Sequence, residues 1–355
     1  MTPAPKPASS HTDLRSASLY RIAIVGAASL MGKELAEVLH DRNFPAADVR
    51  LLDAVESLGQ LEAVGDEMSF IQSVRAEQFE RVDFTFFASD AHSTRTSWRS
   101  ARDLGNTIVD LSNALEDEPG ASVRSPWIER QAGRPVAPQL QPGPVVVAHP
   151  AATALALLAM RAEKAAKVER MISTVLAPAS EYGQKGMDEL HEQTVNLLSF
   201  QELPKNVFDA QVAFNLLARY GPRSNCSLDS NAQLILRHFR QVAPAAVESA
   251  LTVLQAPVFH GHAFSIYLEL DKPVAVNDLS ASLTGDHVVL TEGEDIPNNV
   301  SAAGQGDVVI SLNADANRKN AFWIWAVIDN LRIAALSAIE CAETMTSSRP
   351  RGQIQ

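Results

Sequence analysis

Residues 20–39 have the sequence YRIAIVGAASLMGKELAEVL, which carries the strongest structural signal in the chain. The apolar run at its start predicts a short buried strand, and small residues follow in a tight turn. From about Leu30 apolar residues recur at helical spacing, which predicts an amphipathic helix. A strand, a small-residue turn and a helix in this order begin a parallel βαβ unit.

The same alternation continues towards the C-terminus. Short apolar runs separated by helical stretches are typical of a parallel sheet covered by helices. We expect further strands at 49–53, 82–89, 106–112 and 144–149, and helices at 93–104 and directly after Pro150. The stretch 116–144 is rich in Pro, Gly and charge, so we expect a long connection there.

The second half of the chain has a different character. Longer apolar segments at 168–180, 246–270 and 307–315 predict longer strands in a mixed sheet. A helix is expected at 184–200, and the C-terminal segment is strongly helical from about Ile328. The chain is therefore predicted to be an α/β protein of about two domains, preceded by a flexible tail at residues 1–19.

Charge and cysteine content limit the classes of function. The net charge is −12 and the sequence pI is about 5.2, which argues against nucleic acid and anionic membranes as partners. The two cysteines, Cys226 and Cys341, form no CxxC motif, which is typical of a reduced compartment. No apolar run reaches the length of a membrane span, and the N-terminus has no signal-peptide core. We expect a soluble cytoplasmic protein.

The turn at 26–32 is a candidate dinucleotide site. In such turns the first glycine permits the tight bend, the second lets the backbone approach a pyrophosphate, and the third allows the helix to pack on the strand. Here Gly26 and Gly32 fill the first and third positions, and Ser29 fills the second. The candidate cofactor-binding residues of this turn are Gly26, Ala28, Ser29, Leu30, Met31 and Gly32. The alternative is a turn of the same shape that binds nothing.

Acidic residues after the second predicted strand indicate which dinucleotide is preferred. Asp53 ends that strand, where a carboxylate can accept hydrogen bonds from an adenosine ribose. Glu56 follows and would repel a 2′-phosphate. The pair favours NAD over NADP, although both could instead be solvated loop acids.

Motifs along nearly the whole chain from Tyr20, in their order, resemble the aspartate-semialdehyde dehydrogenase family. Three of the motifs are particularly similar to the family's catalytically depleted Usg branch, namely QTVNLLSFQ, QVAFNLL and APVFHGHA. The others are IVGAASLMGKEL, RNFPAADVRLLDAVESLGQ, TIVDLSNA, VVVAHPAAT, ISTVLAPASEYGQKGMDEL and DNLRIAALSA.

The resemblance implies a domain organisation and a chemistry. It implies a Rossmann-type NAD(P)-binding domain at 20–150 and 326–349, and a domain for substrate binding and dimerisation at 151–325. The protein would be a homodimer. The family's reaction passes through a thioester, in which a cysteine attacks the carbonyl, a histidine moves the proton and NADPH supplies hydride.

Carried onto this sequence, the resemblance places Ala152 at the position of the nucleophilic cysteine. His262 matches the family's histidine. Two arginines that bind phosphate and the substrate carboxylate fall on Glu116 and Gln255, and a glutamine that orients the intermediate falls on Leu176. The changes remove the nucleophile and both bidentate cations, so the resemblance implies a protein that does not perform the thioester reaction. His149 and Thr153 flank the nucleophile position and complete the expected pocket.

Three other chemistries remain open for this pocket. Thr153 could replace the nucleophile, or it could be an ordinary hydrogen-bonding residue at a helix start. His260 and His262 would share one face of a strand, and with His149 they could bind a divalent metal or simply line a polar pocket. A reductase of a semialdehyde or other carbonyl could use NADH and His262 as general acid. The leading expectation is a dimeric module that binds NAD, a small acidic metabolite or a partner protein.

Overall fold

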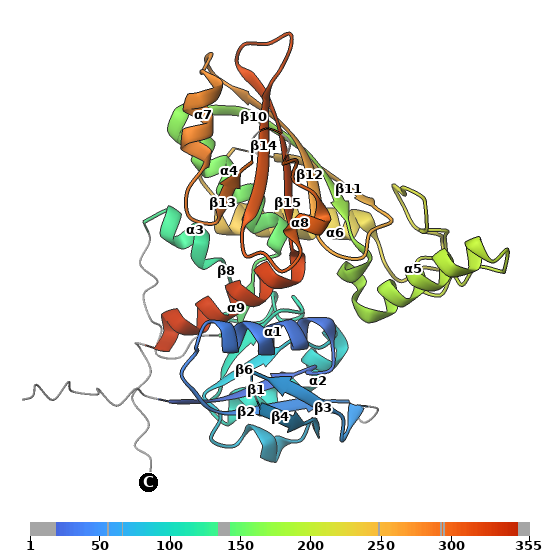
Figure 1. Ribbon diagram of the computed structural model, residues 1–355. Helices are drawn as coiled ribbons and strands as arrows, with labels where there is room; N and C mark the ends of the chain where they lie inside the picture. Colours follow the sequence, from blue (N-terminus) through green and yellow to red (C-terminus); the bar gives the residue numbers. More distant parts are fainter. Residues whose placement is uncertain are drawn as a thin grey trace, which may run out of the picture.

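Two β-sheets organise the chain, one formed by its N-terminal part and the other by its C-terminal part (Figure 1). The computed structural model describes residues 19–54, 57–65, 67–133, 143–247, 249–291, 293 and 295–346. Among these residues no helix has the length and apolar character needed to cross a membrane.

The first sheet has seven strands in the order β5-β2-β1-β6-β7-β9-β8, and every neighbouring pair in it is parallel. The predicted Rossmann-type α/β fold is thereby confirmed. Its strands are β1 (Tyr20–Val25), β2 (Ala46–Asp53), β5 (Gln72–Ser73), β6 (Phe84–Phe87), β7 (Thr107–Asp110), β8 (Ser122–Arg124) and β9 (Val145–Val147).

Helices cover both faces of this sheet, as a parallel sheet with apolar residues on both sides requires. Alternate residues of β1 face opposite layers: Ile22 and Ile24 pack with α1 (Leu30–Asp41) and α9 (Asn330–Thr346). Ala23 and Val25 pack on the side of α2 (Ala91–Asp103). The C-terminal helix α9 therefore returns to the N-terminal sheet, where it lies along α1 (Figure 1).

The expected long connection at 116–144 is wrong in part. Its described residues include β8, at the edge of the sheet beside β9, and the one-turn helix α3 (Pro126–Gln131). A three-residue strand and a six-residue helix are too short to produce a periodic apolar pattern, so the many Pro and Gly residues dominated the prediction.

The second sheet is mixed and has the order β11-β10-β12-β15-β14-β13. The segment 246–270 forms two strands rather than one, and they lie on opposite sides of β10, one parallel and one antiparallel to it. The sequence analysis also missed β15, which runs directly into α9. The strands are β10 (Val168–Ala177), β11 (Ser249–Gln255), β12 (His262–Leu270), β13 (Val288–Leu290), β14 (Val308–Ala314) and β15 (Ala321–Ile328).

One face of the mixed sheet forms the largest core, under α4 (Pro150–Ala165), α6 (Leu228–Val242) and α7 (Val276–Leu283). The other face leaves Ile172 and Trp323 each 44% exposed, and α5 (Gly183–Leu198) projects beside it (Figure 1). The remaining elements are short: the hairpin β3 (Leu61–Val64) and β4 (Glu67–Phe70), the 3-10 helices η2 (Ala76–Phe79) and η3 (Ala179–Tyr182), and α8 (Asn299–Ala302). Helix α4 links the two sheets, because it follows β9 and precedes β10.

Candidate functional site

The turn between β1 and α1 needs both of its glycines. Gly26 has φ +87°, and a Cβ on it would lie 2.5 Å from the backbone nitrogen of Ser89. A Cβ on Gly32 would lie 2.2 Å from the carbonyl oxygen of Gly26. Any side chain at either position would push α1 away from the sheet, so the geometry is that of a dinucleotide-binding turn.

Ser29 does not point its hydroxyl at the position of a pyrophosphate; the side chain is used inside the turn. Its Oγ accepts a hydrogen bond from the Gly32 N–H at 2.9 Å and donates one to the Ala88 carbonyl at 2.9 Å. The backbone N–H groups of Leu30 and Met31 donate to no other described residue. These two donors at the N-terminus of α1 are the groups with which such a turn binds an anion.

Asp53 lies against this turn. Its Oδ2 accepts a hydrogen bond from the Ala28 N–H at 2.7 Å, and its Oδ1 accepts one from the Ala54 N–H at 2.7 Å. A carboxylate is therefore fixed at the end of β2, next to the turn, as a ribose-binding residue has to be. Glu56, the second acid considered, lies outside the described residues.

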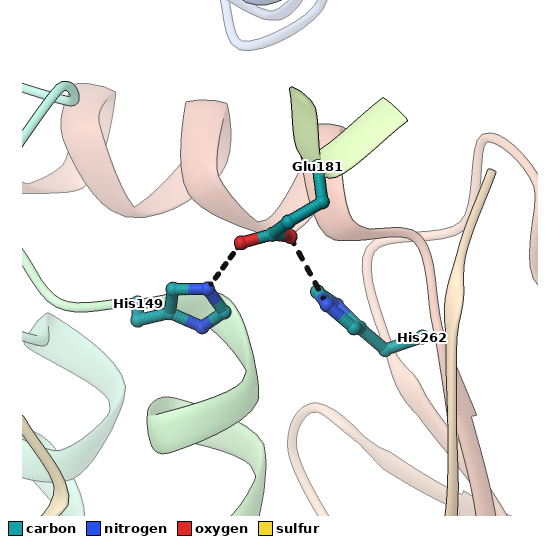
Figure 2. A group of neighbouring side chains, drawn as sticks. All are labelled: His149, Glu181 and His262. Atoms are coloured by element: carbon teal, nitrogen blue, oxygen red, sulfur yellow. Dashed lines mark hydrogen bonds and ion pairs between the residues drawn. The ribbon is translucent and has the colours of Figure 1, made fainter. Parts of the chain in front are cut away.

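A second group of side chains lies at the end of the mixed sheet where β10 ends and β12 begins, beside the start of α4. His149, Glu181 and His262 converge from three separate segments (Figure 2). Glu181 lies between the two imidazoles, with His149 Nε2 2.8 Å from Oε1 and His262 Nε2 3.1 Å from Oε2. The ring centroids of the two histidines are 5.6 Å apart.

Each of the three residues is positioned by the end of a regular element. His149 caps the N-terminus of α4, and its Nδ1 accepts a hydrogen bond from the Ala151 N–H at 3.2 Å. Glu181 lies in η3, which continues the chain after β10, and His262 is the first residue of β12. The antiparallel pairing of β10 with β12 brings these two segments to the same end of the mixed sheet.

The group is almost closed to solvent. His149 is 5% exposed, His262 is 0% exposed, and the Glu181 side chain is 15% exposed. Neither ring nitrogen of His262 makes a hydrogen bond to another described residue, because the approach of Nε2 to Glu181 lies off the hydrogen-bonding direction. A buried imidazole whose nitrogens make no hydrogen bond costs free energy of folding, so the site has to compensate for that loss in another way.

Charge in the group is balanced around Glu181. Burial alone would raise the pKa of Glu181, but the neighbouring imidazoles of His149 and His262 outweigh it and hold that pKa well below its usual value. His238 packs behind the group, where its Nδ1 accepts a hydrogen bond from the His149 backbone N–H at 2.9 Å. Burial, together with the nearby His149, lowers the pKa of His238 to about 4.

His260, a candidate metal ligand in the sequence analysis, is not part of this group. It lies in a bend before β12, and Gly261, with φ +82°, separates it from the first residue of the strand. Residues two apart share a face only within a strand, so the argument that pairs His260 with His262 fails. Glu181 takes the third position instead. The sequence analysis missed it, although Glu181 directly follows a predicted strand and His149 ends one.

The other expected pocket residues have separate contacts. Ala152 is fully buried in the first turn of α4, and the Thr153 hydroxyl, also buried, donates to Ser125 Oγ at 3.2 Å. Leu176 packs against apolar neighbours on the outer face of β10. Gln255 is buried, and its amide accepts from the Tyr220 hydroxyl and donates to two backbone carbonyls. The Thr153 hydroxyl is therefore engaged in a hydrogen bond to another side chain.

Glu116 is paired rather than free. Its carboxylate binds Arg237 through two hydrogen bonds of 2.6 Å each. The hydrogen bonds from Arg237 lower the pKa of Glu116. The acid that the family resemblance places at a phosphate-binding position is thus paired with a cation that the sequence analysis did not place.

Comparisons with known proteins agree with this architecture. The sequence matches the semialdehyde dehydrogenase NAD binding domain over residues 21–168 and the semialdehyde dehydrogenase dimerisation domain over residues 157–333. It is 31% identical to a USG-1 protein homolog of Pseudomonas aeruginosa, over 91% of this chain and 97% of that protein. The chain belongs to the aspartate-semialdehyde dehydrogenase family, and it is Usg-like.

Other members of the aspartate-semialdehyde dehydrogenase family are similar over comparable lengths. The aspartate-semialdehyde dehydrogenase of Rickettsia bellii is 26% identical over 92% of this chain and 97% of its own. The solved structure of a probable aspartate-semialdehyde dehydrogenase from Pseudomonas aeruginosa has a TM-score of 0.82 and 27% identity, and covers 92% of this chain and 98% of its own. The family resemblance predicted from the motifs is confirmed, and with it an NAD(P)-binding domain and a dimerisation domain.

Proposed function

We propose that this family member is a dinucleotide-binding homodimer that does not carry out the thioester reaction of aspartate-semialdehyde dehydrogenases. The observation that carries the proposal is Ala152, in the first turn of α4 and within three residues of His149. A helix N-terminus beside an imidazole would activate a thiol. A methyl group at that position offers no nucleophile.

The two cysteines of the chain do not supply a substitute. Cys341 is fully buried in α9, within the core of the first sheet, and burial raises its pKa to about 12. Cys226 precedes α6, and burial raises the pKa of its thiol as well. Both thiols are therefore protonated at neutral pH, and a thiol is a poor nucleophile.

The surroundings of Ala152 support the same proposal. Gln255 is fully engaged by Tyr220 and two carbonyls, so it has no group left for a substrate carboxylate. Arg237 is the cation nearest to Glu116, and a phosphate would have to displace that carboxylate to bind it. Glu181 adds a negative charge between the two imidazoles. A phosphorylated or acidic substrate has little to bind here.

For the dinucleotide, we propose a preference for NAD over NADP. Asp53 is fixed beside the turn with its carboxylate on the Ala28 amide, where a 2′-phosphate would meet a like charge. The two amides of Leu30 and Met31 remain for a pyrophosphate.

A second candidate, a cysteine-free carbonyl reductase, is favoured by one observation. His262 is held beside a carboxylate, the arrangement that keeps an imidazole ready to give a proton to a carbonyl oxygen. This candidate needs bound NADH and an opening of the buried pocket.

Calorimetric titration of the purified protein with NADH and NADPH tests the proposal. Micromolar binding of NADH with weaker binding of NADPH is expected, and light scattering should give the mass of a dimer. Absence of heat with either nucleotide would contradict the dinucleotide role. Stronger binding of NADPH would contradict the part assigned to Asp53. Oxidation of bound NADH on addition of short aldehydes would favour the reductase.

A further inference from the structure

We propose that His149, Glu181 and His262 form a binding site for a divalent transition-metal ion. This inference goes beyond the proposed function and does not depend on it. The site would take an ion of the Zn²⁺ or Co²⁺ class, with water or another small oxygen ligand completing the coordination.

The geometry of the three donors suits one ion. Each residue offers a ligand atom, and the three atoms lie within 4.8 Å of one another. The carboxylate is 2.8 Å from one imidazole nitrogen and 3.1 Å from the other. Ligands that bind Zn²⁺ at about 2.0 to 2.2 Å in a tetrahedron lie roughly 3.3 to 3.6 Å apart. Small side-chain movements would therefore open the group around an ion.

The donor set selects the class of metal. Two imidazoles and one carboxylate suit zinc, cobalt and iron, whereas calcium and magnesium prefer oxygen ligands alone. Three protein ligands also leave at least one coordination position open. Ala152 supplies no further ligand, so water or a small oxygen anion would fill that position.

The state of His262 is the second observation that points to a ligand. Its ring is fully buried, faces Glu181 (Figure 2) and has no hydrogen bond at either nitrogen to any described residue. A metal ion bound to Nε2 would satisfy the lone pair of that nitrogen, which accepts no hydrogen bond from the described part of the chain. The ion would also balance the charge of the buried Glu181 carboxylate.

Metal binding has one structural cost, at His149. Its Nδ1 accepts from the Ala151 N–H at 3.2 Å, so its Nε2 carries the proton that faces Glu181. Coordination through Nε2 moves that proton to Nδ1 and ends the contact with Ala151. The lost contact is long for an N–H···N hydrogen bond, and the first N–H groups of a helix commonly bond to water, so the cost is small.

Equilibrium dialysis of chelator-treated protein against Zn²⁺, with metal quantified by mass spectrometry, tests the inference on the full chain. One ion per chain is expected for the wild type. Glu181→Gln and His262→Ala should each weaken binding at least about ten-fold, since each removes a ligand. His260→Ala is the matched control: it removes a histidine two residues from the site, and zinc binding should not change.

Co²⁺ gives a readout on the unaltered protein, so that misfolding of a variant cannot hide the answer. The strong visible absorption of four- or five-coordinate Co²⁺ is expected, and Zn²⁺ should displace it. The spectrum of aqueous Co²⁺ alone would overturn the inference. Stoichiometric zinc that survives both Glu181→Gln and His262→Ala would overturn it as well. If calorimetry showed no binding of NADH or NADPH, the zinc and cobalt results would be unaffected. Each proposal can therefore fail without the other.

Discussion

Replacement of Gly32 by alanine should destabilise the protein, although alanine is the better helix former. In an exposed helix interior this change gains about 1 kcal/mol. Here the new Cβ would lie 2.2 Å from the Gly26 carbonyl oxygen and 2.8 Å from the Ala27 Cα. Both are backbone atoms, so no side chain can rotate away. Gly26 cannot retreat either, because its backbone lies close to that of Ser89: a Cβ on Gly26 would be 2.5 Å from the Ser89 nitrogen.

The size of the effect follows from these opposing terms. Overpacking costs typically about 1 to 3 kcal/mol, and occasionally more. A contact this short with rigid backbone belongs at the upper end of that range, about 3 kcal/mol. Subtracting the gain of about 1 kcal/mol in helix propensity leaves a net loss of about 2 kcal/mol in the free energy of unfolding. At an unfolding entropy of about 2.1 cal/mol/K per residue, this loss should lower the melting temperature of a 355-residue protein by roughly 3 °C. The movement of α1 should also remove NADH binding, because the free amides are at its start.

Thermal unfolding and NADH calorimetry, run side by side, measure both effects. Gly105→Ala is the control: its φ is +84°, and a Cβ there would meet nothing within 4 Å. That variant should lose about 1 to 2 kcal/mol through backbone strain alone and bind NADH normally. If Gly32→Ala were as stable as the wild type and bound NADH equally well, the assigned role of this turn would be refuted.

Three further predictions concern charge and chemistry. Asp53→Asn should narrow the difference between NADH and NADPH affinity in calorimetry, because it removes the charge that repels a 2′-phosphate; an unchanged ratio would count against Asp53 as the discriminating residue. Ala152→Cys should not restore phosphate-dependent oxidation of aspartate semialdehyde, because Glu116 and Gln255 stand where the family resemblance places two arginines; reduction of the nicotinamide at the rates of active family members would contradict this. The pKa of His238 is lowered to about 4 in the folded protein, compared with 6.5 in the unfolded chain. The neutral imidazole therefore contributes fully to stability above pH 6.5, and this contribution is lost as the pH falls towards 4. At pH 5 the free energy of unfolding is lower by about 2 kcal/mol. His238→Gln should therefore flatten the pH dependence of stability, measured by urea unfolding between pH 7 and 5. An equally steep dependence in that variant would contradict the buried, neutral state of His238.

Local sequence signals predicted the first βαβ unit well. The apolar run of β1, the small residues of the turn and the periodicity of α1 all lie within twenty residues, so no long-range contact had to be known. Gly26 and Gly32 proved necessary for the reasons that the turn chemistry gives. The side chain of Ser29 was harder to predict, because its partner Ala88 lies 59 positions away.

The candidate site depended on contacts that no local pattern reveals. His149 and His262 were expected to meet because the family resemblance paired them, and the structure brings them together. Glu181 was missed because its position depends on how η3 follows β10. His260 was wrongly included because the positive φ of Gly261 interrupts the strand alternation. The partner of Glu116, Arg237, lies 121 positions away, so no local pattern could predict that this carboxylate is paired.

We propose above that this family member does not catalyse the thioester reaction, because Ala152 offers no nucleophile. The most direct test supplies the wild-type protein with aspartate semialdehyde, phosphate and either NAD or NADP, and follows the absorbance of the reduced nicotinamide. No turnover above the protein-free rate is expected with either cofactor. Phosphate-dependent turnover at the rates of active family members would contradict the placement of Ala152 at the nucleophile position.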